Sequence, residues 1–205
     1  MKIASKIVYA VLGVLLLVSI AQANTLYSIT TSISAADPTQ TGRLVRSGVP
    51  SDWSAPKAFP GINNITTVFH YHTYSVNSGV TPFIFVTMDS VPGNTFASAY
   101  FPSYNPSLVP PNHGMDINYL GDAGSSGNYF GTDPVSFEVV VPLHSNFLIV
   151  VNTSSPVGIG QPFTLTVQGF LDTEFTSTPE PGSLVLFGSG VLGVAGFVRR
   201  KLRLV

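Results

Sequence analysis

Cysteine is absent from the 205-residue chain, and charged side chains make up only 9% of it. The lack of cysteine excludes disulfide bonds, iron–sulfur clusters, thiolate zinc sites and cysteine nucleophiles. The low charge, beside 44% hydrophobic residues, argues against intrinsic disorder and indicates that part of the apolar content serves a membrane. A net charge of −1 gives no reason to expect a nucleic-acid partner.

The few charges are segregated along the chain. Residues 24–178 contain only three basic side chains, those of Arg43, Arg46 and Lys57, against nine acidic ones, which gives this stretch a net charge of −6. The remaining basic residues lie at the two ends, beside the longest apolar runs. This layout predicts an acidic middle flanked by two membrane-targeting segments.

Residues 1–23 are typical of a secretory signal peptide. Two early lysines precede an apolar stretch at residues 8–20, and Ala21 and Ala23 supply the small residues of a cleavage site. Thirteen apolar residues make a helix of about 20 Å, too short for a hydrocarbon core of about 30 Å. We therefore expect Sec-type export machinery and signal peptidase as partners, with cleavage leaving Asn24 as the mature N-terminus.

The C-terminal segment, residues 178–205, has three parts in a fixed order. Pro179-Glu180-Pro181 comes first, and its prolines hold the backbone extended, as a processing enzyme requires in its cleft. An apolar run at residues 183–198 follows, long enough for a short transmembrane helix of about 24 Å. A basic cluster then closes the chain and is expected to stay cytoplasmic: Arg199, Arg200, Lys201 and Arg203.

These three parts resemble the PEP-CTERM protein-sorting signal of exported proteins in Gram-negative bacteria that make extracellular polysaccharide. The resemblance implies recognition by a membrane-embedded exosortase, with Pro179, Glu180 and Pro181 at the positions of its motif. Thr178 stands where the family usually has Val. An ordinary single-pass anchor is the alternative, and it explains the apolar run and the charges but not the Pro-Glu-Pro. The expected location is the inner membrane during sorting, then the cell surface or the medium.

The middle of the chain, residues 24–177, is predicted to be all-β. Short runs rich in β-branched and aromatic residues alternate with Gly, Pro, Asn and Ser clusters, which is typical of a sandwich. We expect a single antiparallel β-sandwich, flanked by the N-terminal signal helix and the C-terminal transmembrane helix. The predicted strands are residues 25–33, 65–76, 80–88, 95–101, 116–121, 135–142, 146–152 and 162–170.

The second half of this region has its own resemblance. A Gly/Ser-rich stretch at residues 119–127, a strand ending at Pro142, and the runs 147–152 and 163–169 follow one another as in pre-peptidase C-terminal type β-sandwiches. Such domains are common in secreted bacterial proteins. The resemblance implies that residues 42–87 supply the earlier strands, and it implies a secreted context but no activity.

Two sets of residues could bind a metal ion. His70 and His72 are two apart on a predicted strand, so they share one face and could chelate zinc, although nothing places a third ligand. Asp116, Asp122 and Asp133 lie in a Gly/Ser/Asn-rich stretch where loop oxygens could hold calcium. Their spacing matches no EF-hand, and aspartate also favours ordinary turns. We therefore expect no cofactor.

Catalytic signatures are absent from the sequence: there is no Gly-x-Ser-x-Gly elbow, His-Glu-x-x-His or P-loop. Five aromatic residues could stack on sugars, but core packing explains them better: Trp53, Phe96, Tyr100, Phe101 and Tyr104. The sequence thus predicts a non-enzymatic exported protein, tethered and then processed, of the cell surface or extracellular polysaccharide matrix. The alternatives are a carbohydrate- or calcium-dependent binding module and a secreted hydrolase.

Overall fold

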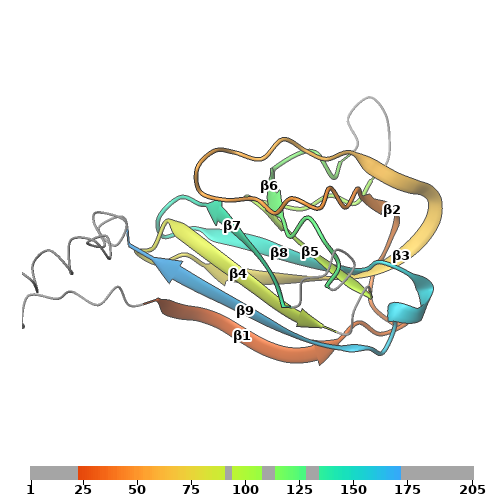
Figure 1. Cartoon of the computed structure of the whole chain (residues 1–205). Helices are drawn as coiled ribbons and strands as arrows, with labels where there is room; N and C mark the ends of the chain where they lie inside the picture. The colour runs from red at the N-terminus through yellow and green to blue at the C-terminus, as the bar shows by residue number, and fades with distance from the viewer. Residues whose placement is uncertain (1–22, 91–93, 108–113, 128–133, 172–205) are drawn as a thin grey trace, which may run out of the picture. The chain divides into compact units, whose positions relative to one another are not determined.

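The structure, a computed structural model, describes residues 23–90, 94–107, 114–127 and 134–171 (Figure 1). The predicted signal helix, transmembrane helix, sorting motif and basic cluster lie outside the described residues. Within the described ranges, no helix is long and apolar enough to span a membrane.

Nine strands and one short 3-10 turn make up the described part of the chain. The strands are β1 (Asn24–Ser32), β2 (Thr39–Leu44), β3 (Ile62–Asn77), β4 (Phe83–Ser90), β5 (Thr95–Tyr100), β6 (Tyr119–Asp122), β7 (Val135–Val140), β8 (Asn146–Thr153) and β9 (Pro162–Phe170), and the turn η1 is Pro156–Gly158.

The strands form two antiparallel sheets. The first, called sheet 1 below, has the order β1-β9-β4-β7, and the second, sheet 2, has the order β2-β3-β8-β5-β6. The sheets pack face to face over a shared apolar core, so the predicted all-β sandwich is confirmed (Figure 1).

Several strands depart from the sequence prediction, and β3 begins at Ile62, three residues before the predicted start. The strand predicted from residue 80 begins at Phe83, because Thr81 closes a turn by donating from its N–H and its hydroxyl to the carbonyl of Ser78. The strand predicted from residue 116 begins at Tyr119, after Asn118 adopts a φ of 65°. The range of β2 was not predicted, although it falls partly in the region expected to supply early strands.

The core between the sheets follows the period-2 alternation of the strands. In β9, Phe163, Leu165 and Val167 are at most 2% exposed, while the residues between them are half-buried. The same alternation brings Ile84, Val86 and Met88 of β4 into the core. The alternating apolar pattern is therefore the main reason that these segments form strands. Because it places the apolar side chains on one face, that face of sheet 1 packs against sheet 2.

A second apolar cluster lies on the other side of β5. Ala97 and Ala99 face the core between the sheets, whereas Phe96 packs with Leu44 and Met115 in the second cluster. All six residues of β5 are consequently buried. The outer face of sheet 2 is thus covered at β5 by apolar side chains from other parts of the chain.

The connection between β2 and β3, residues 45–61, links the edges of the two sheets. Ser51 donates its N–H to the carbonyl of Asp122 in β6 at 3.0 Å, and its own carbonyl accepts from the N–H of Glu138 in β7 at 2.9 Å. A Cβ at Gly121 would collide with the Ser51 side chain, so glycine permits this close approach. One backbone group on each of these two edge strands is thereby paired within the chain.

Both ends of the described chain leave sheet 1 at the same place. Asn24, the first residue of β1, lies opposite Gly169 near the end of β9. The segments that precede β1 and follow β9 are therefore attached to neighbouring points of one sheet.

Candidate functional site

The predicted signal-peptide cleavage site adjoins the sandwich. Ala23 is exposed and directly precedes β1, whereas Ala21 lies outside the described residues. Pro179, Glu180, Pro181 and the basic cluster also lie outside them. Cleavage after Ala23 would remove nothing from the first strand.

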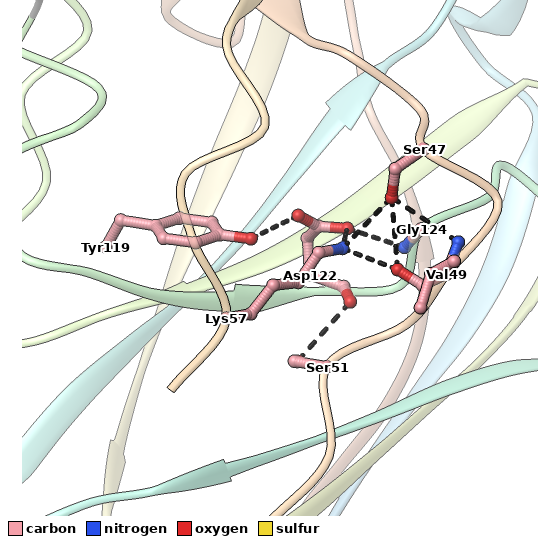
Figure 2. A network of polar contacts seen from close by, with 7 residues as sticks. All are labelled: Ser47, Val49, Ser51, Lys57, Tyr119, Asp122 and Gly124. Carbon is pink, nitrogen blue, oxygen red and sulfur yellow. Dashed lines mark hydrogen bonds and ion pairs between the residues drawn. The ribbon is translucent and has the colours of Figure 1, made fainter. Parts of the chain in front are cut away.

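Asp122 is the centre of a network of polar contacts (Figure 2). Its side chain is fully buried, and its Oδ1 lies 2.7 Å from Nζ of Lys57 and accepts the N–H of Gly124 at 2.6 Å. The hydroxyl of Tyr119 donates to Oδ2. Both carboxylate oxygens are therefore engaged by groups of the protein itself.

Lys57 carries this network into the β2–β3 connection. Its ammonium also donates to the carbonyl of Val49 at 2.6 Å and to Oγ of Ser47 at 3.3 Å (Figure 2). The N–H of Gly48 donates to the carbonyl of Gly124 at 2.9 Å. These contacts fasten the connection to the stretch that follows β6, so the network acts as a structural lock, which we call the Asp122 lock.

The phenol in the lock is held in its neutral form. Burial, and after it the negative charge of Asp122, raise the pKa of Tyr119 well above its ordinary value. Tyr119 therefore remains a hydrogen-bond donor to the carboxylate at physiological pH. A donor that stays protonated and points at a paired carboxylate suits packing and orientation rather than proton transfer.

His70 and His72 share one face of β3, as predicted, and both contact Asp37 in the connection between β1 and β2. Nδ1 of His72 lies 3.0 Å from Oδ1 of Asp37, and Nδ1 of His70 lies 3.1 Å from the carbonyl oxygen of the same residue. The His72 ring also packs on the ring of Tyr74, with 4.8 Å between centroids. The pair thus connects β3 to the preceding loop.

Two pKa shifts accompany this contact. Burial acts to raise the pKa of Asp37, but hydrogen bonds with His72 and Ser34 outweigh it, so the pKa lies below its ordinary value. Burial raises the pKa of Tyr74 to about 12. The contact therefore favours a charged carboxylate beside a neutral phenol.

The structure does not bring the three candidate calcium ligands together. Asp116 is exposed in a turn, Asp122 is buried in its own lock, and Asp133 lies outside the described residues. Across the described ranges, no group of three or more His, Cys, Asp or Glu side chains is placed to hold a metal ion.

The aromatic residues considered as a sugar-binding platform are mostly inside the protein. Phe96 is 1% exposed and Tyr100 is fully buried. Tyr104 packs on Tyr100, with 4.6 Å between centroids, and donates its hydroxyl to Oε1 of Gln40 at 2.6 Å. Burial raises the pKa of both tyrosines well above its ordinary value. Their faces are therefore used in packing.

Trp53 is half-buried on the outer side of sheet 1. Its indole N–H donates to the carbonyl of Ile84 at 3.2 Å, and its ring meets Phe83 and Phe170 edge-on at 5.8 and 5.5 Å between centroids. Its backbone N–H donates to Oε2 of Glu138 at 3.1 Å. Trp53 thus anchors the β2–β3 connection to sheet 1.

The sequence reasoning missed the role of Lys57. The signal that could have pointed to it is its isolation: it is one of three basic residues in an acidic stretch of 155 positions, residues 24–178. A lysine is seldom buried unless an anionic group pairs with it. Its partner, 65 positions later, could not be chosen from spacing.

Comparison with known proteins identifies the tail. The family model described as the PEP-CTERM protein-sorting motif matches residues 177–201. No curated protein and no solved structure matches the chain significantly. The fold is compatible with a pre-peptidase C-terminal type sandwich, but no match to that family is found. The chain therefore ends in a PEP-CTERM sorting motif, which indicates an exported protein that an exosortase processes.

Proposed function

We propose that this protein is a non-enzymatic component of the cell surface or of the extracellular polysaccharide matrix. In this proposal a signal peptide delivers the chain across the inner membrane. The C-terminal segment then holds it there until an exosortase processes it. The observation that carries the proposal is the sorting motif directly behind a β-sandwich.

The sandwich supports a structural rather than a catalytic role. The buried carboxylate of Asp122 is paired with Lys57 and Tyr119, and His72 is paired with Asp37. These side chains fasten loops to strands. The acidic charge of residues 24–178 favours a solvated surface that repels its own copies.

Mass spectrometry of the protein from envelope and medium tests the proposal. We expect a mature chain that begins at Asn24 and ends near Pro179. Intact peptides covering residues 199–205 in every fraction would contradict it and favour a permanent anchor.

A variant of the motif sharpens this experiment. Glu180→Ala should leave residues 199–205 attached and retain the chain in the membrane, because the exosortase loses the central residue of its motif. Glu174→Ala is the matched control, since it removes an equal charge six positions earlier, outside the matched residues. Equal processing of the two variants would argue against recognition through the motif.

A further inference from the structure

One end of the sandwich gathers exposed apolar side chains. β7 and β9 finish there, β1 and β4 begin there, and the turns before β4 and after β7 close it (Figure 1). Four large apolar side chains at this end are between 40% and 58% exposed. We call this group the apolar end: Val80, Val140, Leu143 and Leu171.

Two members of the apolar end lie in turns that contact each other. Val80 belongs to the turn before β4, and Leu143 belongs to the turn after β7. The N–H of His144 donates to the carbonyl of Gly79 at 2.7 Å, which joins the two turns directly beside these side chains.

The other two members lie at the ends of neighbouring strands. Phe83, at the start of β4, pairs with Val140 of β7 on one side and with Phe170 of β9 on the other. Leu171 directly follows Phe170. Single exposed apolar residues are ordinary, whereas a group on adjoining segments indicates a surface that makes a contact.

The apolar end also lacks ionised groups. No Asp, Glu, Lys or Arg occurs in the four segments that form it: residues 23–26, 77–83, 140–146 and 168–171. In contrast, the opposite end of the sandwich carries Asp37 before β2 and Asp89 near the end of β4. Removing water from a charged group is the costly part of entering an apolar medium. These four segments avoid that cost.

The chain itself indicates which apolar medium is near. Leu171 is the last residue of the described ranges, and residues 172–182 separate it from the apolar run at residues 183–198. A connection of this length spans at most about 40 Å, even fully extended. While the apolar run is held in a bilayer, the apolar end is therefore confined close to the surface of that bilayer.

We propose that the apolar end lies on the lipid surface of the inner membrane while the chain is tethered. This inference rests on the proposed function, because it requires the C-terminal segment to hold the chain in the membrane before processing. Val80 and Leu143 would enter the boundary between the head groups and the acyl chains. The tether supplies the high effective concentration that four side chains need for such a contact, so processing would also release the sandwich from the lipid.

Spin labels on single cysteines test the inference, and the absence of native cysteine makes each label unique. Leu143→Cys and Val80→Cys label the apolar end. Val157→Cys is the matched control, because Val157 is 72% exposed and lies in η1, before the start of β9 at the opposite end. The unprocessed chain is reconstituted into vesicles of phosphatidylethanolamine and phosphatidylglycerol, and the processed product is measured without vesicles.

The measured quantity is the collision rate of each label with a water-soluble nickel complex. We expect vesicles to lower this rate at least about threefold for the labels at positions 143 and 80, because the lipid boundary excludes the complex. The rate at position 157 should be lowered much less. Equal reduction at all three positions would overturn the inference, since it would show no preferred contact of the apolar end.

A charged side chain at the apolar end tests the same contact in a second way. Leu143→Asp should restore access of the nickel complex to the label at position 80, because a carboxylate resists transfer out of water. Val157→Asp is the matched control and should leave that label protected. Both substitutions are at exposed positions, so neither should shift the urea midpoint appreciably. Protection that persists in Leu143→Asp would contradict the inference.

Two further outcomes separate the occupants and the hypotheses. Protection of both labels without vesicles, together with a dimer in sedimentation, would assign the apolar end to a second copy and overturn the inference. The proposed function survives that result if the chain is processed near Pro179. An unprocessed chain in every cell fraction would instead contradict the proposed function, whatever the labels show.

Discussion

At the scale of single residues, one pair of opposite charges is taken into the protein. Asp122 and Lys57 form an ion pair whose side chains are 0% and 14% exposed. Taking two charges out of water is costly, and the cost is offset only when further groups complete the hydrogen bonding. Tyr119, Gly124 and the Val49 carbonyl do so here.

Lys57→Met should therefore lower the free energy of unfolding by about 3 kcal/mol, because it leaves the Asp122 carboxylate buried without its cation. Urea unfolding at pH 7 measures the change. The double variant Lys57→Met, Asp122→Asn should recover part of the loss, since it also removes the stranded charge. A single variant as stable as the unmodified protein would show that the pair is dispensable.

The Asp37–His72 contact gives the stability a dependence on pH. The folded-state pKa of Asp37 lies below its unfolded value of about 3.9, so its contribution is present above that value and is lost as the pH falls through the folded pKa. Asp37→Asn should cost on the order of 0.5–1 kcal/mol at pH 7, and the cost should shrink at pH 3.

Urea unfolding of Asp37→Asn at both pH values measures this difference. Asp116→Asn is the matched control, because it removes one carboxylate from an exposed turn. A gap between Asp37→Asn and the unmodified protein that stays constant from pH 7 to pH 3 would rule out this linkage.

The sequence identified residues of the right kind but not their partners. His70 and His72 were correctly placed on one face, because the period of a strand is local information. That Asp37 would meet them was not predictable, because the contact joins a loop and a strand 35 positions apart. The sequence likewise predicted Asp122 as a possible calcium ligand in a loop. Its actual partner, Lys57, lies 65 positions away and could not be identified from the sequence.

At the scale of elements, local patterns predicted most strands. Residues 162–170 were predicted as a strand and form β9 with the same bounds, because apolar and polar residues alternate from Phe163 to Gln168. In contrast, β2 contains Gly42, with a φ of 77°, and four polar residues. Its pairing with β3 and its burial come from tertiary packing, which a strand pattern does not reveal.

The β2–β3 connection depends on Trp53, the single tryptophan of the chain. Trp53→Ala removes the ring contacts with Phe83 and Phe170 and the hydrogen bond to Ile84. The connection should then open more often, and trypsin should cleave after Lys57 at least about fivefold faster.

Time courses of limited trypsin digestion measure this opening. Trp53→Phe is the control, since it keeps an aromatic ring but loses the indole N–H, and it should be cleaved at an intermediate rate. Equal cleavage of all three proteins would show that Trp53 does not fasten the connection.

At the scale of the whole molecule, the strand order makes sheet 1 depend more on β9 than on β1 for its stability. β9 lies between β1 and β4, whereas β1 pairs with β9 alone among the described strands. A chain that ends at Gly160 should therefore lose its cooperative unfolding transition, because sheet 1 is divided. A chain that lacks residues 24–32 should keep a transition at a lower urea concentration.

Far-UV circular dichroism during urea titration distinguishes these two deletions. Similar transitions for both would mean that sheet 1 does not depend on its inner strand.

The two-sheet architecture itself was predictable from the number and spacing of strands. The order of strands within each sheet was not, because many orders bury the same alternating faces.

The meeting of Asn24 and Gly169 has a consequence for the order of events during export. β1 is the first of the described strands to be synthesised, and it pairs with β9, the last of them. Until some 145 further residues have been made, β1 has nothing to pair with in sheet 1. Under the export route proposed above, this delay leaves β1 unpaired in sheet 1 while the chain crosses the membrane, and the sandwich closes after β9 has crossed.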